Sequence, residues 1–293
     1  MRISANGLQI EVDDQGPAGA PAVLLIMGLG MQLIAWPDEL VQDLVRRGFR
    51  VVRFDNRDIG LSQHFDELGL PNLAWAGMRH LLHLNVRAPY RLAEMAADAL
   101  GVLDALGIAQ AHVCGASMGG MIAQHLAAAH GERVRSLTLL MTTAGARRLP
   151  QPSMAVRQAL LARPASSRPD DVVAHLQRVL ATIGSPAYPP DPALMHARLL
   201  ASVQRSWHPA GTLRQLTAVV ADGDRTPLLS RIRMPTLVMH GEADPLIPVA
   251  AAHHLAEHIA GAEKDIVPGM GHDLPLPLMP RLAAGIAETA GRA

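Results

Sequence analysis

The feature that most constrains this chain is the pentapeptide Gly115-Ala116-Ser117-Met118-Gly119, which reads Gly-x-Ser-x-Gly. An apolar run precedes it and a helical pattern follows. A serine on so sharp a strand-to-helix turn needs glycine on both sides, because a Cβ there would collide with neighbouring backbone. The turn exposes the Ser117 hydroxyl beside the N–H of Met118, at a helix N-terminus that favours developing negative charge. The pattern therefore predicts a nucleophile elbow for acyl transfer. The alternative is an ordinary turn in a chain with 25 glycines.

Around the elbow, short apolar runs alternate with helical patterns. Strands are expected at residues 8–12, as an edge strand, and at 22–27, 50–54 and 134–141, besides the strand that enters the elbow. Helices are expected at 37–47, 91–106 and 118–130. Continuous apolar runs too short for helices are typical of strands buried on both faces. The alternation predicts a mostly parallel sheet flanked by helices, an α/β fold, and it leaves 64–89 as an irregular segment.

This alternation stops between residues 146 and 228. The segment offers several helical patterns, each opened by a proline or by an Asx or serine cap, and no strand. Strands at 236–239 and 265–267, with helices at 249–258 and 279–289, then resume the earlier pattern. We therefore expect a core formed by 1–145 and 229–293, with 146–228 inserted as a helical cap over the edge where ligands bind in such folds.

The overall charge and the cysteine count limit the kind of partner. Lysine plus arginine equals aspartate plus glutamate at 26 each, which leaves no electrostatic footprint for nucleic acid or an anionic membrane. The single cysteine, Cys114, fits a reducing compartment. Neither an apolar leader nor a membrane-length apolar run is present. We expect a cytoplasmic protein that acts on a small molecule, and the 14 methionines suit an adaptable apolar pocket.

A serine nucleophile needs a base and a carboxylate that orients the base. His272 stands in a glycine-rich turn after the last expected strand, and Asp244 follows the strand before it. The alternatives are a solvated loop histidine at 272 and Glu242 as the acid. The chain order Ser117, Asp244, His272 is the order that an elbow of this kind uses.

The second donor to the oxyanion is expected in the turn after the first buried strand. The backbone N–H groups of Leu29 and Met118 form the predicted oxyanion hole, although Gly28 and Gly30 could simply turn the chain. Gly28 and Trp207 are the candidate residues of the substrate pocket, with ordinary packing as the alternative for Trp207.

A second motif suggests a different chemistry. His254-Leu255-Ala256-Glu257-His258 matches a zinc-peptidase pattern, with both histidines one helical turn apart. The helix is expected on the outside of the sheet, far from the elbow, and a polar helix face explains the pattern equally well. We expect neither a metal nor a cofactor.

Taken together, these motifs resemble the α/β-hydrolase superfamily, and within it the aclacinomycin methylesterase group. The resemblance rests on Met27-Gly28, Trp36-Pro37-Asp38-Glu39, Asp55-x-Arg57-Asp58-x-Gly60-x-Ser62, Ser117-Met118-Gly119 and Pro268-Gly269-Met270-Gly271-His272. It implies a Ser-His-Asp esterase under a helical cap, with Ser117 as nucleophile, His272 as base, Asp244 as acid and the Leu29 and Met118 amides as oxyanion hole. Met27-Gly28 replaces the usual His-Gly, and Arg57-Asp58 replaces the usual Arg-Gly. Neither change removes a catalytic atom.

The expected function is that of a serine hydrolase that cleaves a carboxylic ester of a mostly apolar small molecule through an acyl-enzyme. Three alternatives remain open from the sequence. The same triad serves lactonases and hydrolases of carbon–carbon bonds, and a slow-turnover receptor of a small molecule could keep it as well.

Overall fold

A computed structural model describes residues 1–82 and 84–293 of the chain. Its strands form one eight-stranded sheet in the order β1-β2-β4-β3-β5-β6-β7-β8, in which β1/β2 and β2/β4 are antiparallel and all other pairs are parallel. The strands are β1 (Arg2–Ala5), β2 (Leu8–Gln15), β3 (Ala22–Ile26), β4 (Arg50–Phe54), β5 (Ala111–Ala116), β6 (Val134–Leu140), β7 (Thr236–Gly241) and β8 (Glu263–Val267). Because β3 to β8 run parallel, the loops after them meet at one edge of the sheet.

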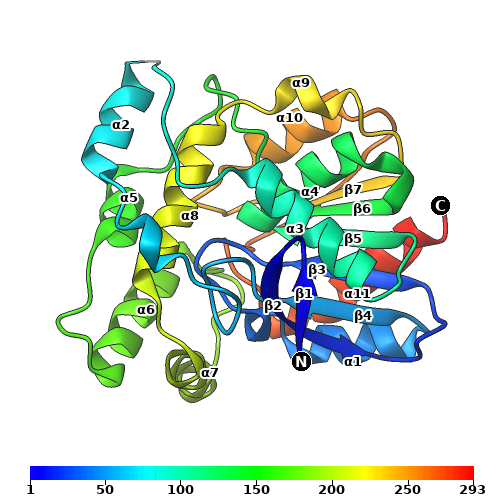
Figure 1. Ribbon diagram of the computed structural model, residues 1–293, viewed down its shortest axis with the longest axis horizontal. Coiled ribbons are helices and arrows are strands. Elements are labelled where there is room, and N and C mark those ends of the chain that lie inside the picture. Colours follow the sequence, from blue (N-terminus) through cyan, green and yellow to red (C-terminus); the bar gives the residue numbers. More distant parts are fainter. Residues whose placement is uncertain (83) are drawn as a thin grey trace.

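Helices cover both faces of this sheet, as the strand-helix alternation predicts (Figure 1). One face carries α3 (Leu92–Ala105), α4 (Met118–Ala129) and α10 (Ala250–His258), and the other carries α1 (Asp38–Arg46) and α11 (Met279–Ala290). The central strands β3 and β5 are wholly buried, which explains the unbroken apolar sequence of β3 and the mostly apolar sequence of β5, in which His112 is the exception.

Between β6 and β7 the chain forms helices with no strand among them, and these helices lie at one end of the sheet (Figure 1). They are α5 (Met154–Leu161), α6 (Pro169–Ile183), α7 (Pro192–Arg205) and α8 (Pro209–Asp222). Ser153 and Asp191 cap α5 and α7 with their side chains, and α6 and α8 begin at prolines, as the sequence predicts. The short α9 (Thr226–Leu229) follows and packs on α4 and α10.

Two expectations need correction. The strand at residues 8–12 is not an edge strand, because β1 pairs with it on its outer side, from Arg2↔Glu11 to Ala5↔Leu8. Four residues with mixed polarity are too short to give a strand signal in the sequence. The described residues of the segment left irregular contain a short 3-10 helix (Asp66–Leu68) and a helix, α2 (Leu73–Leu81), while residue 83 lies outside the described residues.

The polar turn that follows β4 is held by ion pairs, although not by a pair within the turn. Asp58 accepts two hydrogen bonds of 2.7 Å from the guanidinium of Arg214 in α8, and both side chains are buried. Asp55 pairs with Arg205 at 2.7 Å. Arg57 pairs with Asp98 of α3. Two of these three pairs tie the turn to α7 and α8. The helices α5 to α8, called the helical insertion below, are therefore bound to the sheet through buried charges.

Candidate active site

The elbow has the strained backbone that its sequence predicts. Ser117 lies between β5 and α4 with φ 53° and ψ −119°, a left-handed conformation that is rare for residues other than glycine. A Cβ on Gly119 would overlap the carbonyl oxygen of Ile26, and one on Gly115 would overlap that of Gly119. The sheet fixes the serine further, because its N–H donates to Leu140 O at 2.9 Å and its C=O accepts from the Thr142 hydroxyl at 2.7 Å.

The histidine and the carboxylate expected from the sequence both reach this serine. The Ser117 hydroxyl is 3.0 Å from Nε2 of His272, and Nδ1 of His272 is 2.7 Å from Oδ2 of Asp244. Each residue follows its own parallel strand, β5, β7 or β8, at the same sheet edge. The structure thus brings together three side chains that are up to 155 residues apart in the chain.

Asp244 is buried and fully hydrogen-bonded. Its Oδ1 accepts from the N–H groups of Leu246 and Ile247, both at 2.8 Å, while Oδ2 faces His272 and lies 3.4 Å from Nε2 of His240. Burial by itself raises the pKa of Asp244, but the hydrogen bonds from His240 and His272 outweigh it and lower the pKa to about 2. The carboxylate is therefore ionised at neutral pH, which orients His272 with Nδ1 protonated and Nε2 free to accept the serine proton.

The loop that carries His272 is held by the end of α6 and the residues after it. The N–H of His272 donates to Ile183 O at 2.7 Å, and the N–H of Gly271 donates to the Ser185 hydroxyl at 2.8 Å. That hydroxyl in turn donates to Asp273. Ser185 is 4% exposed, so this contact is shielded from water. Sequence reasoning did not single out Ser185, since nothing local signals a contact 86 residues away.

Two backbone N–H groups adjoin the serine. Met118 is the first residue of α4, so its N–H has no acceptor within the helix. The Leu29 N–H follows Gly28, where a Cβ would stand 3.2 Å from the Cβ of Ser117, and it donates to no acceptor among the described residues. The turn is held from α8, because the Gly30 N–H donates to Gln215 Oε1 at 3.0 Å. Met118 adjoins the serine in the chain, and Leu29 follows the glycine that packs against it, so both amides are candidate donors to an oxyanion.

The two candidate pocket residues differ in position. Gly28 lies against the elbow, where any side chain would crowd Ser117. Trp207 packs on an apolar cluster between α6 and α7 that includes Val172, Val173 and Leu199. Its place in the substrate pocket stays a prediction.

The histidines of the zinc-peptidase pattern make other contacts. His254 lies 2.8 Å from the Thr226 hydroxyl through Nε2 and 3.3 Å from Arg148 through Nδ1, and His258 Nδ1 lies 2.8 Å from the carbonyl oxygen of His254. Burial and the neighbouring His258 lower the pKa of His254. The histidines of this pattern therefore contact residues of the neighbouring chain, as expected for the polar face of a packed helix.

A different set of side chains comes close enough to share a metal ion within the described part of the chain. His64, Asp66 and His208 bring one ligand atom each within 4.8 Å of one another. However, the His64 and His208 rings are stacked, with centroids 3.8 Å apart and planes at 4°, so their ring nitrogens do not converge on one point. Both nitrogens of His208 are hydrogen-bonded, to Asp58 O at 2.9 Å and to Asp66 at 2.8 Å. The group fits a link between the polar turn and α8 better than a metal centre.

A comparison with protein families assigns the chain to a family with this fold. Residues 21–170 match the model of the α/β hydrolase fold family, and the chain belongs to that family. Within the described residues, no helix is both long enough and apolar enough to cross a membrane.

Relatives of known name extend this result. The chain is 32% identical over 291 residues to the rhodomycin D methylesterase DnrP of Streptomyces peucetius, covering 92% of this chain and 90% of that one. It is 31% identical to the rhodomycin D methylesterase DauP of Streptomyces sp. strain C5, with the same coverage. The crystal structure of the enol-lactonase from Burkholderia xenovorans LB400 superposes with a TM-score of 0.73 at 24% identity, covering 99% of this chain and 98% of that one. The family and these relatives confirm the expected class, a carboxylic ester hydrolase of the α/β-hydrolase fold.

Proposed function

We propose that Ser117, His272 and Asp244 form the catalytic triad of this hydrolase and that it works through an acyl-enzyme. The observation that carries the proposal is the continuous chain of contacts, 3.0 Å from the serine hydroxyl to Nε2 and 2.7 Å from Nδ1 to the carboxylate. These are hydrogen-bond distances without any substrate present, so the base needs no rearrangement to reach the nucleophile.

The reaction then proceeds in two balanced halves. Nε2 of His272 takes the serine proton while Oγ attacks the ester carbonyl, and the resulting oxyanion accepts hydrogen bonds from the Leu29 and Met118 N–H groups. The imidazolium returns the proton to the departing alcohol, which leaves Ser117 acylated. A water molecule then gives one proton to His272 while its oxygen attacks the acyl carbon. The tetrahedral intermediate releases the carboxylic acid, and the imidazolium returns the proton to the Ser117 oxygen. Ionised Asp244 stabilises the imidazolium in both halves.

The proposed substrate is an ester of a mostly apolar small molecule. Gly28 leaves space beside the serine, and the methionine-rich, uncharged composition favours an apolar acyl group. The named relatives are rhodomycin D methylesterases, and we extend to this chain only a small alcohol as the leaving group. Residues 146–228 are proposed to form the cap over this site, with 1–145 and 229–293 as the core.

The proposed location is the cytoplasm. A single cysteine that is wholly buried suits a reducing compartment, where disulfides contribute nothing to stability. The equal numbers of acidic and basic residues favour a small-molecule partner over nucleic acid.

Steady-state assays on matched substrates test the function. Methyl and p-nitrophenyl esters from one series of acyl chain lengths are compared with a lactone of the same carbon number, with Ser117→Ala as the control. We expect multiple turnovers on the esters, a higher kcat/KM on esters than on the lactone, and no effect of a chelator. A preference for the lactone would replace the proposal with a lactonase, and a single turnover with retained product would replace it with a receptor.

A further inference from the structure

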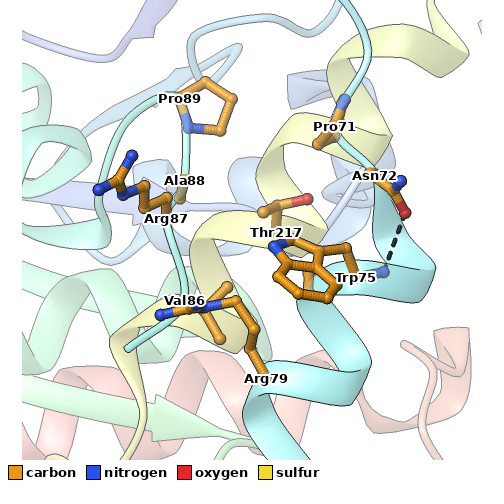
Figure 2. A pocket seen from close by; sticks show the side chains of 10 residues that line it. Pro71, Asn72, Trp75, Arg79, Val86, Arg87, Ala88, Pro89 and Thr217 are labelled. Atoms are coloured by element: carbon orange, nitrogen blue, oxygen red, sulfur yellow. Dashed lines mark hydrogen bonds between the residues drawn. The ribbon is translucent and has the colours of Figure 1, made fainter. Parts of the chain in front are cut away.

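A second pocket lies apart from the serine, between α2, the extended residues 86–89 and α8 (Figure 2). Its volume is about 520 Å³, which is the size of a small-molecule site. None of the residues proposed for catalysis lines it. Thr217 of α8 forms part of its wall, while Gln215 of the same helix holds the oxyanion turn through Gly30.

The walls of this pocket combine an aromatic surface with apolar residues. Trp75 of α2 is 53% exposed, although tryptophan is among the residues with most to gain from burial, and its indole ring stands at the centre of the pocket in Figure 2. Val86, Ala88 and Pro89 line the opposite wall. An apolar planar group is the natural occupant of such a space.

Two arginines stand at this pocket: Arg79 holds its guanidinium beside Trp75, whereas the Arg87 guanidinium is turned away from that ring (Figure 2). Arg79 holds its guanidinium 5.9 Å from the Trp75 ring centre and donates through Nε to Asn85 O at 2.7 Å, so its two terminal nitrogens stay available. Arg87 makes no ion pair or hydrogen bond within the described ranges 1–82 and 84–293. No acidic residue lines the pocket, and none occurs between Glu67 and Glu94 in the sequence.

We propose that this pocket binds an aromatic carboxylate at a site separate from the triad. The ring would lie against Trp75 and the apolar wall. The carboxylate would accept charge-assisted hydrogen bonds from Arg79 and from Arg87, whose side chain would turn toward the pocket to reach it. A planar guanidinium suits a carboxylate because two parallel N–H groups match its two oxygens. A neutral ligand would leave both guanidinium groups without an anionic partner. A polyphosphate would need more donors than two side chains supply.

Binding of 2-naphthoate, measured by isothermal titration calorimetry at low salt, tests the proposal. We expect saturable binding of one ligand per chain, unchanged when Ser117 is blocked by a phosphonate. The neutral isostere 2-naphthylmethanol should bind at least about tenfold more weakly, the equivalent of one lost charge-assisted hydrogen bond. Trp75→Ala and Arg79→Gln should weaken 2-naphthoate to a similar extent.

The decisive variant is Arg87→Gln, because the side chain has no hydrogen bond in the described structure whose loss could disturb the fold. It should weaken 2-naphthoate about tenfold. Arg46→Gln on α1 is the matched control and should bind like the wild type, since Arg46 is a surface arginine on a different helix whose only ion pair is at 3.6 Å. Four results would each overturn the proposal. They are no saturable binding up to roughly 10 mM, a weak-affinity limit worth only about 3 kcal/mol; equal binding of the neutral alcohol; unchanged binding in Arg87→Gln; and loss of binding when Ser117 is blocked.

Discussion

The elbow and the histidine loop hold their reacting side chains by different means. Ser117 is fixed by the sheet itself, through contacts with β3, β6 and α4 that admit only glycine at Gly115 and Gly119. His272 is fixed by the helical insertion, through Ile183 and Ser185. The nucleophile therefore depends on core packing, whereas the base depends on how the insertion is seated. Anything that loosens the insertion should affect catalysis through the histidine before it affects the serine.

Removing either reacting group should have the largest effect. Ser117→Ala and His272→Ala should each lower kcat by roughly 10⁵–10⁶-fold, because serine and histidine act as a unit. The double variant should be no slower than either single variant when steady-state kinetics are measured on the best ester. If His272→Ala kept most of the activity, the base would be another residue and the comparison of the two loops would lose its basis.

Two ion pairs link the insertion to the core, and variants of them test how strongly each pair holds the insertion in place. Arg214 and Asp58 are buried, whereas Arg198 and Glu39 are 43% and 50% exposed. Arg214→Met leaves the Asp58 charge buried and unpaired, and should reduce the free energy of unfolding by about 3–5 kcal/mol. Arg198→Gln is the control and should change it by less than about 1 kcal/mol.

Urea unfolding measures both variants. An equal loss of unfolding free energy in both variants would show that the buried pair does not hold α8 on the core. A loss confined to Arg214→Met would support the view that the insertion is bound to the sheet by buried charge.

The contact between the insertion and the histidine loop should have a smaller effect, seen in the chemical step. Ser185→Ala removes the acceptor of the Gly271 N–H and should lower kcat roughly tenfold with little change in KM, because a slightly displaced base costs rate more than binding. Ser230→Ala, at an exposed serine whose hydroxyl lies 3.4 Å from Pro227 O, is the matched control. An unchanged kcat in Ser185→Ala would mean that the loop holds its position without the insertion.

The smallest effect concerns pH. The pKa of Asp244 is about 2 in the folded protein and about 3.9 in an unfolded chain. Because the folded value is lower, the carboxylate stabilises the fold fully above about pH 4, by about 3 kcal/mol, and that stabilisation is lost as the pH falls through 2. The difference in unfolding free energy between wild type and Asp244→Asn should therefore shrink by about 1 kcal/mol between pH 6 and pH 3. A constant difference would mean that Asp244 has an ordinary pKa.

Most of the core and the relative order of the site residues could be predicted from the sequence. Buried parallel strands are continuous apolar runs, and the elbow has a local steric requirement that glycine reveals. The edge strand β1 escaped prediction because four residues are too few to show a strand pattern. Sequence alone left Glu242 open as the acid, and the contact of 2.7 Å belongs to Asp244, whose Oδ1 is held by two amides of the following turn.

The links between insertion and core could not be predicted. Arg214 and Asp58 are 156 residues apart, and Gly30 and Gln215 are 185 apart. Neither pair leaves a pattern in its own neighbourhood, because the chemistry of a buried ion pair depends only on the folded arrangement. The charged residues of the turn after β4 likewise find their partners in α3, α7 and α8.

Covalent labelling tests the central claim most directly. A p-nitrophenyl alkylphosphonate should react with the wild-type protein to release p-nitrophenolate once per chain, and mass spectrometry should find the phosphonyl group on the peptide that contains Ser117. Labelling should be absent in Ser117→Ala and far slower in His272→Ala, since the serine proton then has no acceptor. A phosphonyl group on another residue, or unchanged labelling of Ser117→Ala, would contradict the account.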